Sequence, residues 1–149
     1  MKEPIIADSS CLIGLENVGR LDLLPALFDP IWATPEVQRE FGVAVPWLRV
    51  EAPVDAALVT ALKMLVDSGE AEAIALARER GWRLILDDQR ARKVAANLGV
   101  RLIGTVGVLV NARKAGILPN VKAVLTNLEA NGFFISSELR AEALRLVGE

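Results

Sequence analysis

Short apolar runs alternate along this chain with longer stretches in which apolar residues recur at helical spacing. Residues 5–7 and 84–86 are continuously apolar, as strands covered on both faces of a sheet usually are. The stretch that contains Ala73, Ile74 and Ala77 instead places its apolar side chains on one stripe of a helix. The pattern therefore predicts short buried strands separated by amphipathic helices.

Strands and helices alternate through most of the chain. Strands are predicted at residues 5–7, 31–33, 84–86 and 100–103, with an edge strand at 133–135. Helices are predicted at residues 11–15, 20–28, 36–41, 54–66, 67–80, 89–98, 104–115, 121–130 and 137–147, and a loop at 42–53. This alternation favours an α/β fold, a three-layer α/β/α sandwich with a central parallel sheet of four to five strands.

The size and composition of the chain favour one domain. Its 149 residues, 52% of them hydrophobic, can bury about two-thirds of the surface of the unfolded chain. We expect a single domain over residues 1–149, with the helices from about residue 121 as an extension. No apolar run reaches the ~18 residues of a membrane span, and no cationic start precedes an apolar core, so we expect a cytoplasmic protein.

The residue types that are missing exclude several kinds of chemistry. The chain has no His, which rules out Ser-His-Asp triads, His-ligated zinc and His-based ribonuclease chemistry within it. The single Cys11 excludes an internal disulfide and a Cys-pair metal site. There is no Gly-rich phosphate-binding motif. Catalysis by this chain would therefore depend mainly on carboxylates, and the net charge of −2 means that a polyanion would need a local basic patch or bound cations.

Acids from four separate segments are expected to meet at one edge of the sheet. Asp8, Asp87 and Asp88 follow predicted strands, and ligands of open parallel sheets bind beyond the carboxyl ends of the strands. Glu40 and Glu70 lie on predicted helices that flank these strands. Clustered carboxylates repel one another unless a divalent cation is held between them, and Mg²⁺ or Mn²⁺ prefers oxygen ligands. The pattern predicts a Mg²⁺ or Mn²⁺ site formed by Asp8, Glu40, Glu70 and Asp88, with Asp87 as a further ligand.

Each of these acids also has a local explanation. Asp8 suits the cap of the helix that follows it, and either Asp87 or Asp88 suits the cap of the helix at 89–98. Asp67 and Glu70 have the spacing of a capping box. The sequence leaves both explanations open for each acid.

Hydroxyl and basic side chains surround the predicted site. Ser10 and Thr105 lie at strand-to-helix turns, where their hydroxyls either orient a phosphate or a water, or cap the helix locally. Three basic residues follow the Asp pair: Arg90, Arg92 and Lys93. They either bind RNA or are solvated charges of a surface helix.

These motifs together resemble the PIN domain family of metal-dependent ribonucleases. The similarity covers residues 5–118 and rests on residues 5–10, 35–40, 69–77 and 84–88, which contain Asp8, Glu40, Glu70 and Asp88 in order. Many relatives have Asp where this chain has Glu70. Residues 69–74, 86–92 and 104–109 resemble a prokaryotic PIN-like subgroup of unassigned function that is similar to toxin–antitoxin ribonucleases.

The resemblance implies that the protein is an endoribonuclease that cleaves RNA phosphodiester bonds with a metal-activated water. It further implies a homodimer and a small antitoxin protein as a partner, with no membrane association. Two alternatives remain. One is a non-catalytic PIN-fold module that binds nucleic acid or protein, and the other is a small metal-dependent phosphohydrolase.

Overall fold

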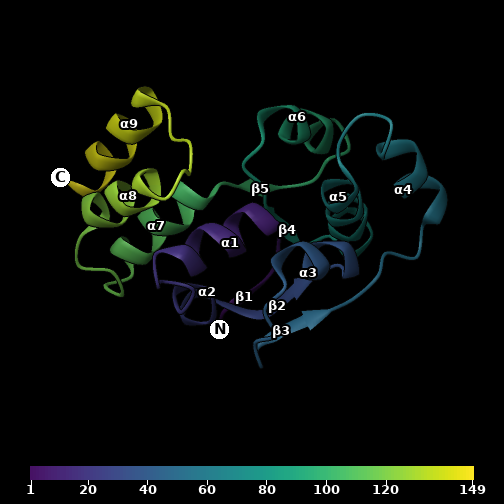
Figure 1. Cartoon of the computed structure of the whole chain (residues 1–149), viewed down its shortest axis with the longest axis horizontal. Helices are drawn as coiled ribbons and strands as arrows, with labels where there is room; N and C mark the ends of the chain where they lie inside the picture. Colours follow the sequence, from purple (N-terminus) through teal and green to yellow (C-terminus); the bar gives the residue numbers. More distant parts are fainter.

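A five-stranded parallel sheet forms the centre of the computed structural model, which describes residues 1–149 (Figure 1). The strand order is β3-β2-β1-β4-β5, and every neighbouring pair is parallel. The strands are β1 (Glu3–Ala7), β2 (Phe28–Ala33), β3 (Leu48–Val50), β4 (Arg83–Ile85) and β5 (Leu102–Ile103). The predicted α/β fold with a parallel sheet of four to five strands is confirmed.

Nine helices flank this sheet. They are α1 (Ser9–Asn17), α2 (Leu23–Leu27), α3 (Pro35–Phe41), α4 (Ala56–Leu62), α5 (Ser68–Arg80), α6 (Gln89–Asn97), α7 (Thr105–Lys114), α8 (Val121–Ala130) and α9 (Ser137–Val147). Helix α5 packs on β1 and β4, and α3 and α4 pack against α5. Helices α7, α8 and α9 pack on one another, and α8 also contacts α1 (Figure 1). None of the helices has the length and apolar composition that crossing a membrane requires.

Two predicted segments are wrong. The predicted loop 42–53 contains strand β3, which pairs with β2 at the edge of the sheet. Only Leu48 of this strand is buried, so three residues between two prolines give no recognisable strand pattern. The predicted edge strand 133–135 is a loop, because the Phe133 N–H donates to the carbonyl oxygen of Leu128 and completes the end of α8.

Helix α3 is fixed at its start against α5. Thr34 Oγ1 accepts a hydrogen bond from the Val37 N–H at 3.4 Å and Pro35 is the first helical residue, as predicted. The backbone N–H of Glu36 donates to Glu72 Oε1 on α5 at 3.0 Å. This contact holds the first turn of α3 beside the first turns of α5.

Helix α5 is buried on more sides than its apolar stripe predicts. Ala73, Ile74 and Ala77 are buried as expected, but Ala71 and Ala75 on the opposite side are buried as well. Helices α3 and α4 also pack on α5, α3 against Gly69 and Glu72 and the segment before α4 against Glu79. The helix ends at Gly81, whose φ of 69° is readily adopted only by glycine.

Candidate metal centre

The acids predicted to bind a metal lie around the switch point of the sheet. Strand β1 lies between β2 and β4, and the chain adds β2 and β3 on one side of it and β4 and β5 on the other. Asp8 directly follows β1, and its backbone N–H donates to the carbonyl oxygen of Ile85 at 3.2 Å. Asp87 and Asp88 follow the neighbouring strand β4. This is the position at which open parallel sheets bind ligands.

The carboxyl group of Asp8 is buried, and one of its two oxygens has no hydrogen-bond partner. The residue is 4% exposed, Oδ1 has no hydrogen-bond partner, and the side chain makes no capping hydrogen bond to α1. Asp8 occupies the N-cap position of α1, as its local explanation predicts, but its side chain does not make the capping hydrogen bond. Burial is the main cause that raises the pKa of Asp8 to about 7, although a hydrogen bond from the Ser9 backbone lowers it. The negative charges of Glu70, Asp67 and Glu40 also raise this pKa.

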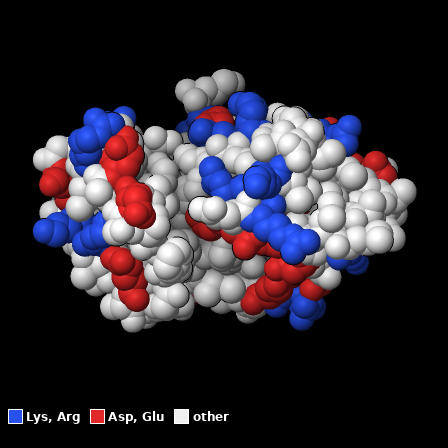
Figure 2. Space-filling model, turned by 90° about the horizontal axis from the view of Figure 1, so that it is seen from above, with Lys and Arg blue, Asp and Glu red and all other residues white.

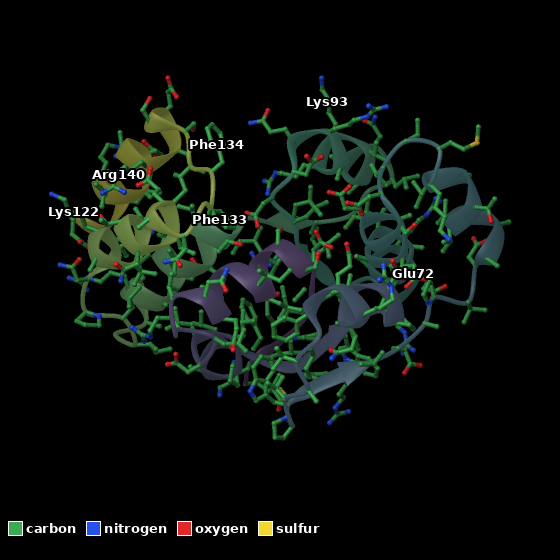
Figure 3. All side chains as sticks on the ribbon, in the orientation of Figure 1. Glu72, Lys93, Lys122, Phe133, Phe134 and Arg140 are labelled. Atoms are coloured by element: carbon green, nitrogen blue, oxygen red, sulfur yellow. The ribbon has the colours of Figure 1, made fainter.

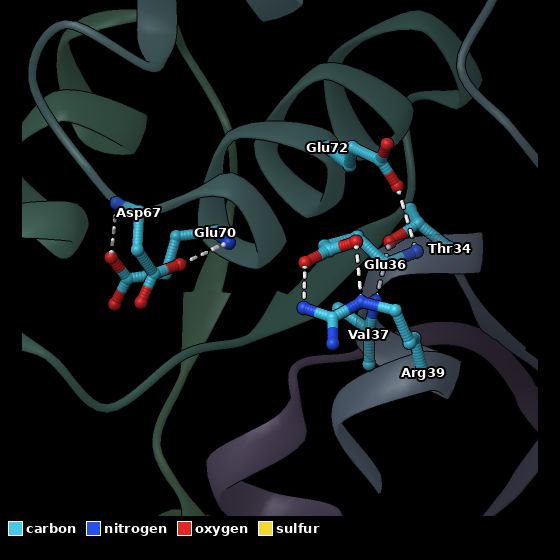
Figure 4. A network of polar contacts seen from close by, with 7 residues as sticks. All are labelled: Thr34, Glu36, Val37, Arg39, Asp67, Glu70 and Glu72. Carbon is cyan, nitrogen blue, oxygen red and sulfur yellow. Dashed lines mark hydrogen bonds and ion pairs between the residues drawn. The ribbon is translucent and has the colours of Figure 1, made fainter. Parts of the chain in front are cut away.

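Glu40 reaches the same region from α3. It lies against Gly69 at the start of α5, so closely that a Cβ atom at Gly69 would overlap Glu40 Oε1. Partial burial raises the pKa of Glu40, and the charges of Asp67 and Glu36 raise it further. Glu36 itself pairs with Arg39 (Figure 4). A hydrogen bond from the Ser9 side chain and the positive charge of Arg39 oppose these effects and lower the pKa of Glu40.

The start of α5 contributes Asp67 and Glu70. They form the predicted capping box, in which the Glu70 N–H donates to Asp67 Oδ1 at 2.8 Å and the Asp67 N–H donates to Glu70 Oε1 at 3.2 Å (Figure 4). Burial raises the pKa of Glu70 to about 7, with the hydrogen bond from Asp67 opposing it and the charges of Asp67, Asp88 and Glu40 adding to it.

The sequence pattern indicates Asp67 only as a cap. Its Oδ1 and Glu40 Oε1 both lie beside Gly69, and its charge raises the pKa of Asp8, Glu40 and Glu70. A capping residue next to a predicted ligand is the only signal in the sequence that could have indicated this.

Asp88 caps α6 and also belongs to the group. Its Oδ2 accepts a hydrogen bond from the Ala91 N–H at 2.9 Å, as its local explanation predicts. The cap uses one carboxylate oxygen, and the charge of Asp88 raises the pKa of Glu70. The structure thus brings together five carboxylates, here called the acidic centre, which are Asp8, Glu40, Asp67, Glu70 and Asp88.

Asp87 is held apart from the acidic centre. Its Oδ1 accepts a hydrogen bond from the Thr105 N–H at 2.8 Å, and its Oδ2 accepts from the hydroxyls of Thr105 at 2.6 Å and Ser10 at 3.3 Å. The two hydroxyls predicted to orient a substrate therefore fix Asp87, which joins the starts of α1 and α7 to the end of β4. A direct role of Ser10, Thr105 or Asp87 toward a substrate or metal stays a prediction.

No carboxylate of the acidic centre forms a salt bridge. All six salt bridges of the structure involve other carboxylates. No three Asp, Glu or Cys side chains stand in the arrangement that would hold a metal ion by protein atoms alone. The donors still fit Mg²⁺ or Mn²⁺, because these ions take oxygen ligands and Mg²⁺ keeps several waters while binding one or two carboxylates directly. The unpaired Oδ1 of Asp8 is one such donor.

A groove with basic residues on one wall begins at Asp87, next in sequence to Asp88 of the acidic centre. It has a volume of about 910 Å³ and extends from Asp87 along α6 to the start of α9. Arg90 and Lys93 are exposed on α6 and form no salt bridge, whereas Arg92 donates to the carbonyl oxygen of Leu86 at 2.7 Å. Figure 2 shows basic and acidic side chains next to one another on the face that contains α6. The groove thus presents basic side chains along α6 and reaches Asp87, the residue that precedes Asp88 of the acidic centre.

The sequence matches a known protein family over nearly its whole length. A family model described as the PIN domain matches residues 4–149. No curated protein sequence matches the chain. PIN domains are generally nucleases and typically use divalent metal ions. Because the match spans nearly the whole chain and agrees with the parallel sheet and its ring of flanking helices, the chain belongs to the PIN domain family.

Proposed function

We propose that the protein is a metal-dependent endoribonuclease whose catalytic residues are Asp8, Glu40, Glu70 and Asp88. The observation that carries this proposal is the buried carboxyl of Asp8, whose Oδ1 has no hydrogen-bond partner, beside further carboxylates that form no salt bridge. A buried negative charge is costly unless a positive charge accompanies it. A site that concentrates such charge is suited to a divalent cation and, through it, to a phosphodiester.

The acidic centre supplies ligands from four segments of the chain. A bound Mg²⁺ or Mn²⁺ would activate water for attack on phosphorus and stabilise the charge that develops on the phosphate. Asp8 would be the innermost ligand, because its Oδ1 has no other partner. Glu40, Glu70 and Asp88 would act directly or through bound water, and Asp67 would add negative charge and orient Glu70 through the capping box.

Residues beside the acidic centre would position the RNA. Arg90 and Lys93, on the wall of the groove, would contact phosphates that flank the cleaved bond. Arg92 would contribute charge while its hydrogen bond to Leu86 keeps α6 at the end of β4. Ser10 and Thr105 would act mainly by holding Asp87 in place.

The biological setting is proposed from the family alone. The similarity to toxin–antitoxin ribonucleases supports a cytoplasmic toxin, with a small antitoxin protein as partner and a homodimer as the active form. Induced expression would then arrest growth, and co-expression of the product of an adjacent small gene would relieve the arrest. Growth that is unaffected by the wild type and by Asp8→Asn alike would contradict the toxin role.

Replacing Asp8 by Asn is expected to abolish RNA cleavage. The substitution removes the innermost negative ligand, so kcat/KM should fall by about a hundredfold or more. The measurement is cleavage of structured and unstructured RNAs in Mn²⁺ or in chelator, with Asp29→Asn as the control because Asp29 is an exposed aspartate on β2 outside the acidic centre.

The same assay separates the alternatives. RNA that stays intact under every condition, with the wild type indistinguishable from Asp8→Asn, would indicate a non-catalytic module. Cleavage of a generic phosphoester with RNA left intact would indicate a phosphohydrolase.

Gly69→Ala is expected to reduce cleavage by about tenfold without destabilising the fold. The new Cβ would displace the flexible Glu40 carboxylate, while Ala in place of Gly favours a helix by up to about 1 kcal/mol. Cleavage rates and thermal unfolding measured side by side test this expectation. Adding Glu40→Asp, which shortens the side chain by one methylene, should restore part of the activity. Full activity in Gly69→Ala would show that the position of Glu40 does not matter.

Without divalent ions, the protein is expected to be less stable at pH 8 than at pH 5. The folded-state pKa values of Asp8 and Glu70 are raised to about 7 from ordinary values of 3.8 and 4.5. At pH values between the ordinary and the raised pKa, the folded chain binds more protons than the unfolded chain. The free energy of unfolding therefore falls as pH rises toward 7 and then levels off. Chemical denaturation at each pH measures this.

Removing the negative charge of Asp8 or adding a divalent cation should restore the stability that is lost at pH 8. Asp8→Asn should raise the free energy of unfolding at pH 8 by roughly 2 kcal/mol, and Mn²⁺ at pH 8 should stabilise the wild type but not Asp8→Asn. Asp29→Asn should keep the wild-type pH dependence. Equal stability of the wild type at both pH values would contradict the raised pKa values.

A further inference from the structure

Phe134 is an aromatic side chain that the fold leaves in solvent. It is 86% exposed, whereas full burial of a Phe side chain stabilises a protein by about 1.5–3 kcal/mol. It lies in the loop between α8 and α9, on the side of these helices that faces α6 and Lys93 (Figure 3). Nothing in the packing of the chain accounts for an aromatic ring at this position.

The residues on either side of Phe134 fix its backbone. Ile135 is 7% exposed and belongs to the core. Phe133 packs on the core and so closely against α1 that a Cβ atom at Gly14 would approach Phe133 Cδ2 to 2.9 Å. Phe134 is therefore an exposed ring on an anchored loop, and binding a ligand there would require little ordering of the chain.

The loop lies beside both the groove and the region of Asp87. Phe133 lines a small pocket together with Ser10, whose hydroxyl donates to Asp87. Ser136, two residues after Phe134, lines the 910 Å³ groove opposite the basic residues of α6. Phe134 does not line the groove itself but stands two residues before Ser136, on the side that faces Lys93 (Figure 3). Asp88 of the acidic centre lies in sequence between Asp87 and Gln89, which both line the groove.

An exposed aromatic ring beside basic side chains matches the bases and the phosphates of a nucleic-acid strand. Phosphates attract the cations of α6, and unpaired bases stack on aromatic rings independently of their identity. We propose that Phe134 is a positioning residue that stacks on an unpaired base of the RNA while Arg90 and Lys93 contact the adjoining phosphates. The inference rests on the proposed function, since it assumes that the groove leads RNA to the acidic centre.

Binding is measured separately from cleavage to test this role. The full-length Asp8→Asn protein is titrated with a single-stranded oligoribonucleotide of about ten nucleotides in versions that each lack one base. Phe134→Ala is expected to weaken binding by about tenfold, and Phe134→Trp to retain it, because stacking contributes about 1–3 kcal/mol per base. Phe134→Leu should behave like Ala, because Leu is apolar but cannot stack.

The base-deleted oligonucleotides identify the stacked position. Removing one particular base should weaken binding to the Phe134 protein by a similar factor and have no further effect on Phe134→Ala. Met64→Ala is the matched control, because Met64 is 82% exposed and does not line the groove. Thermal unfolding of the Phe134 variants should match that of the parent protein.

The outcomes distinguish this inference from the proposed nuclease function. Cleavage by the wild type together with unchanged RNA binding in Phe134→Ala would overturn the stacking role and favour a protein partner for this loop. Restoration by Leu, or no measurable RNA binding by the parent protein, would overturn it as well. Weaker binding in Phe134→Ala with no cleavage by the wild type would support the stacking role and contradict the nuclease function.

Discussion

The buried carboxyl group of Asp8 is the constraint on which the rest of the site depends. It stands at the end of the central strand, where hydration is lost and no protein donor replaces it on Oδ1. A charge in such a place must either take up a proton or gain a counter-ion. The neighbouring carboxylates favour protonation of Asp8 at low pH, and they favour binding of a counter-ion when cations are available. The sheet topology thus buries a carboxylate at the end of β1 that forms no salt bridge with any residue of the chain.

The predictable part of the fold came from patterns that depend on local physics. The apolar runs before Asp8 and Asp87 identified β1 and β4, and the Thr34-Pro35 pair fixed the start of α3. Strand β3 was missed because its pairing with β2 decides its conformation, while its own three residues carry almost no signal. The strand predicted at residues 133–135 is wrong because an apolar pattern is present but no strand is available to pair with it. Two of these apolar side chains anchor the loop to the core, and the third is exposed.

The site shows the same division between local and tertiary causes. The predicted capping hydrogen bonds of Asp88 and Glu70 are present, and each cap leaves one carboxylate oxygen free of it. The Asp8 side chain, in contrast, makes no capping hydrogen bond. The adjacent residues Asp87 and Asp88 could not be separated from sequence, because the direction of each side chain depends on how the backbone leaves β4. Three donors from α1 and α7 hold Asp87, and such partners become visible only when those helices are placed.

Small side chains on α5 give the site a property that its acids do not determine. The distance between packed helices depends on the size of the side chains at their contact, and at Gly69 the carboxylate of Glu40 touches the helix with no side chain between them. The position of the Glu40 carboxylate relative to the other carboxylates therefore depends on an uncharged residue. A larger side chain at Gly69 would displace that carboxylate from α5, and ion-size selectivity, for instance Ca²⁺ over Mg²⁺, would become adjustable without altering a single ligand.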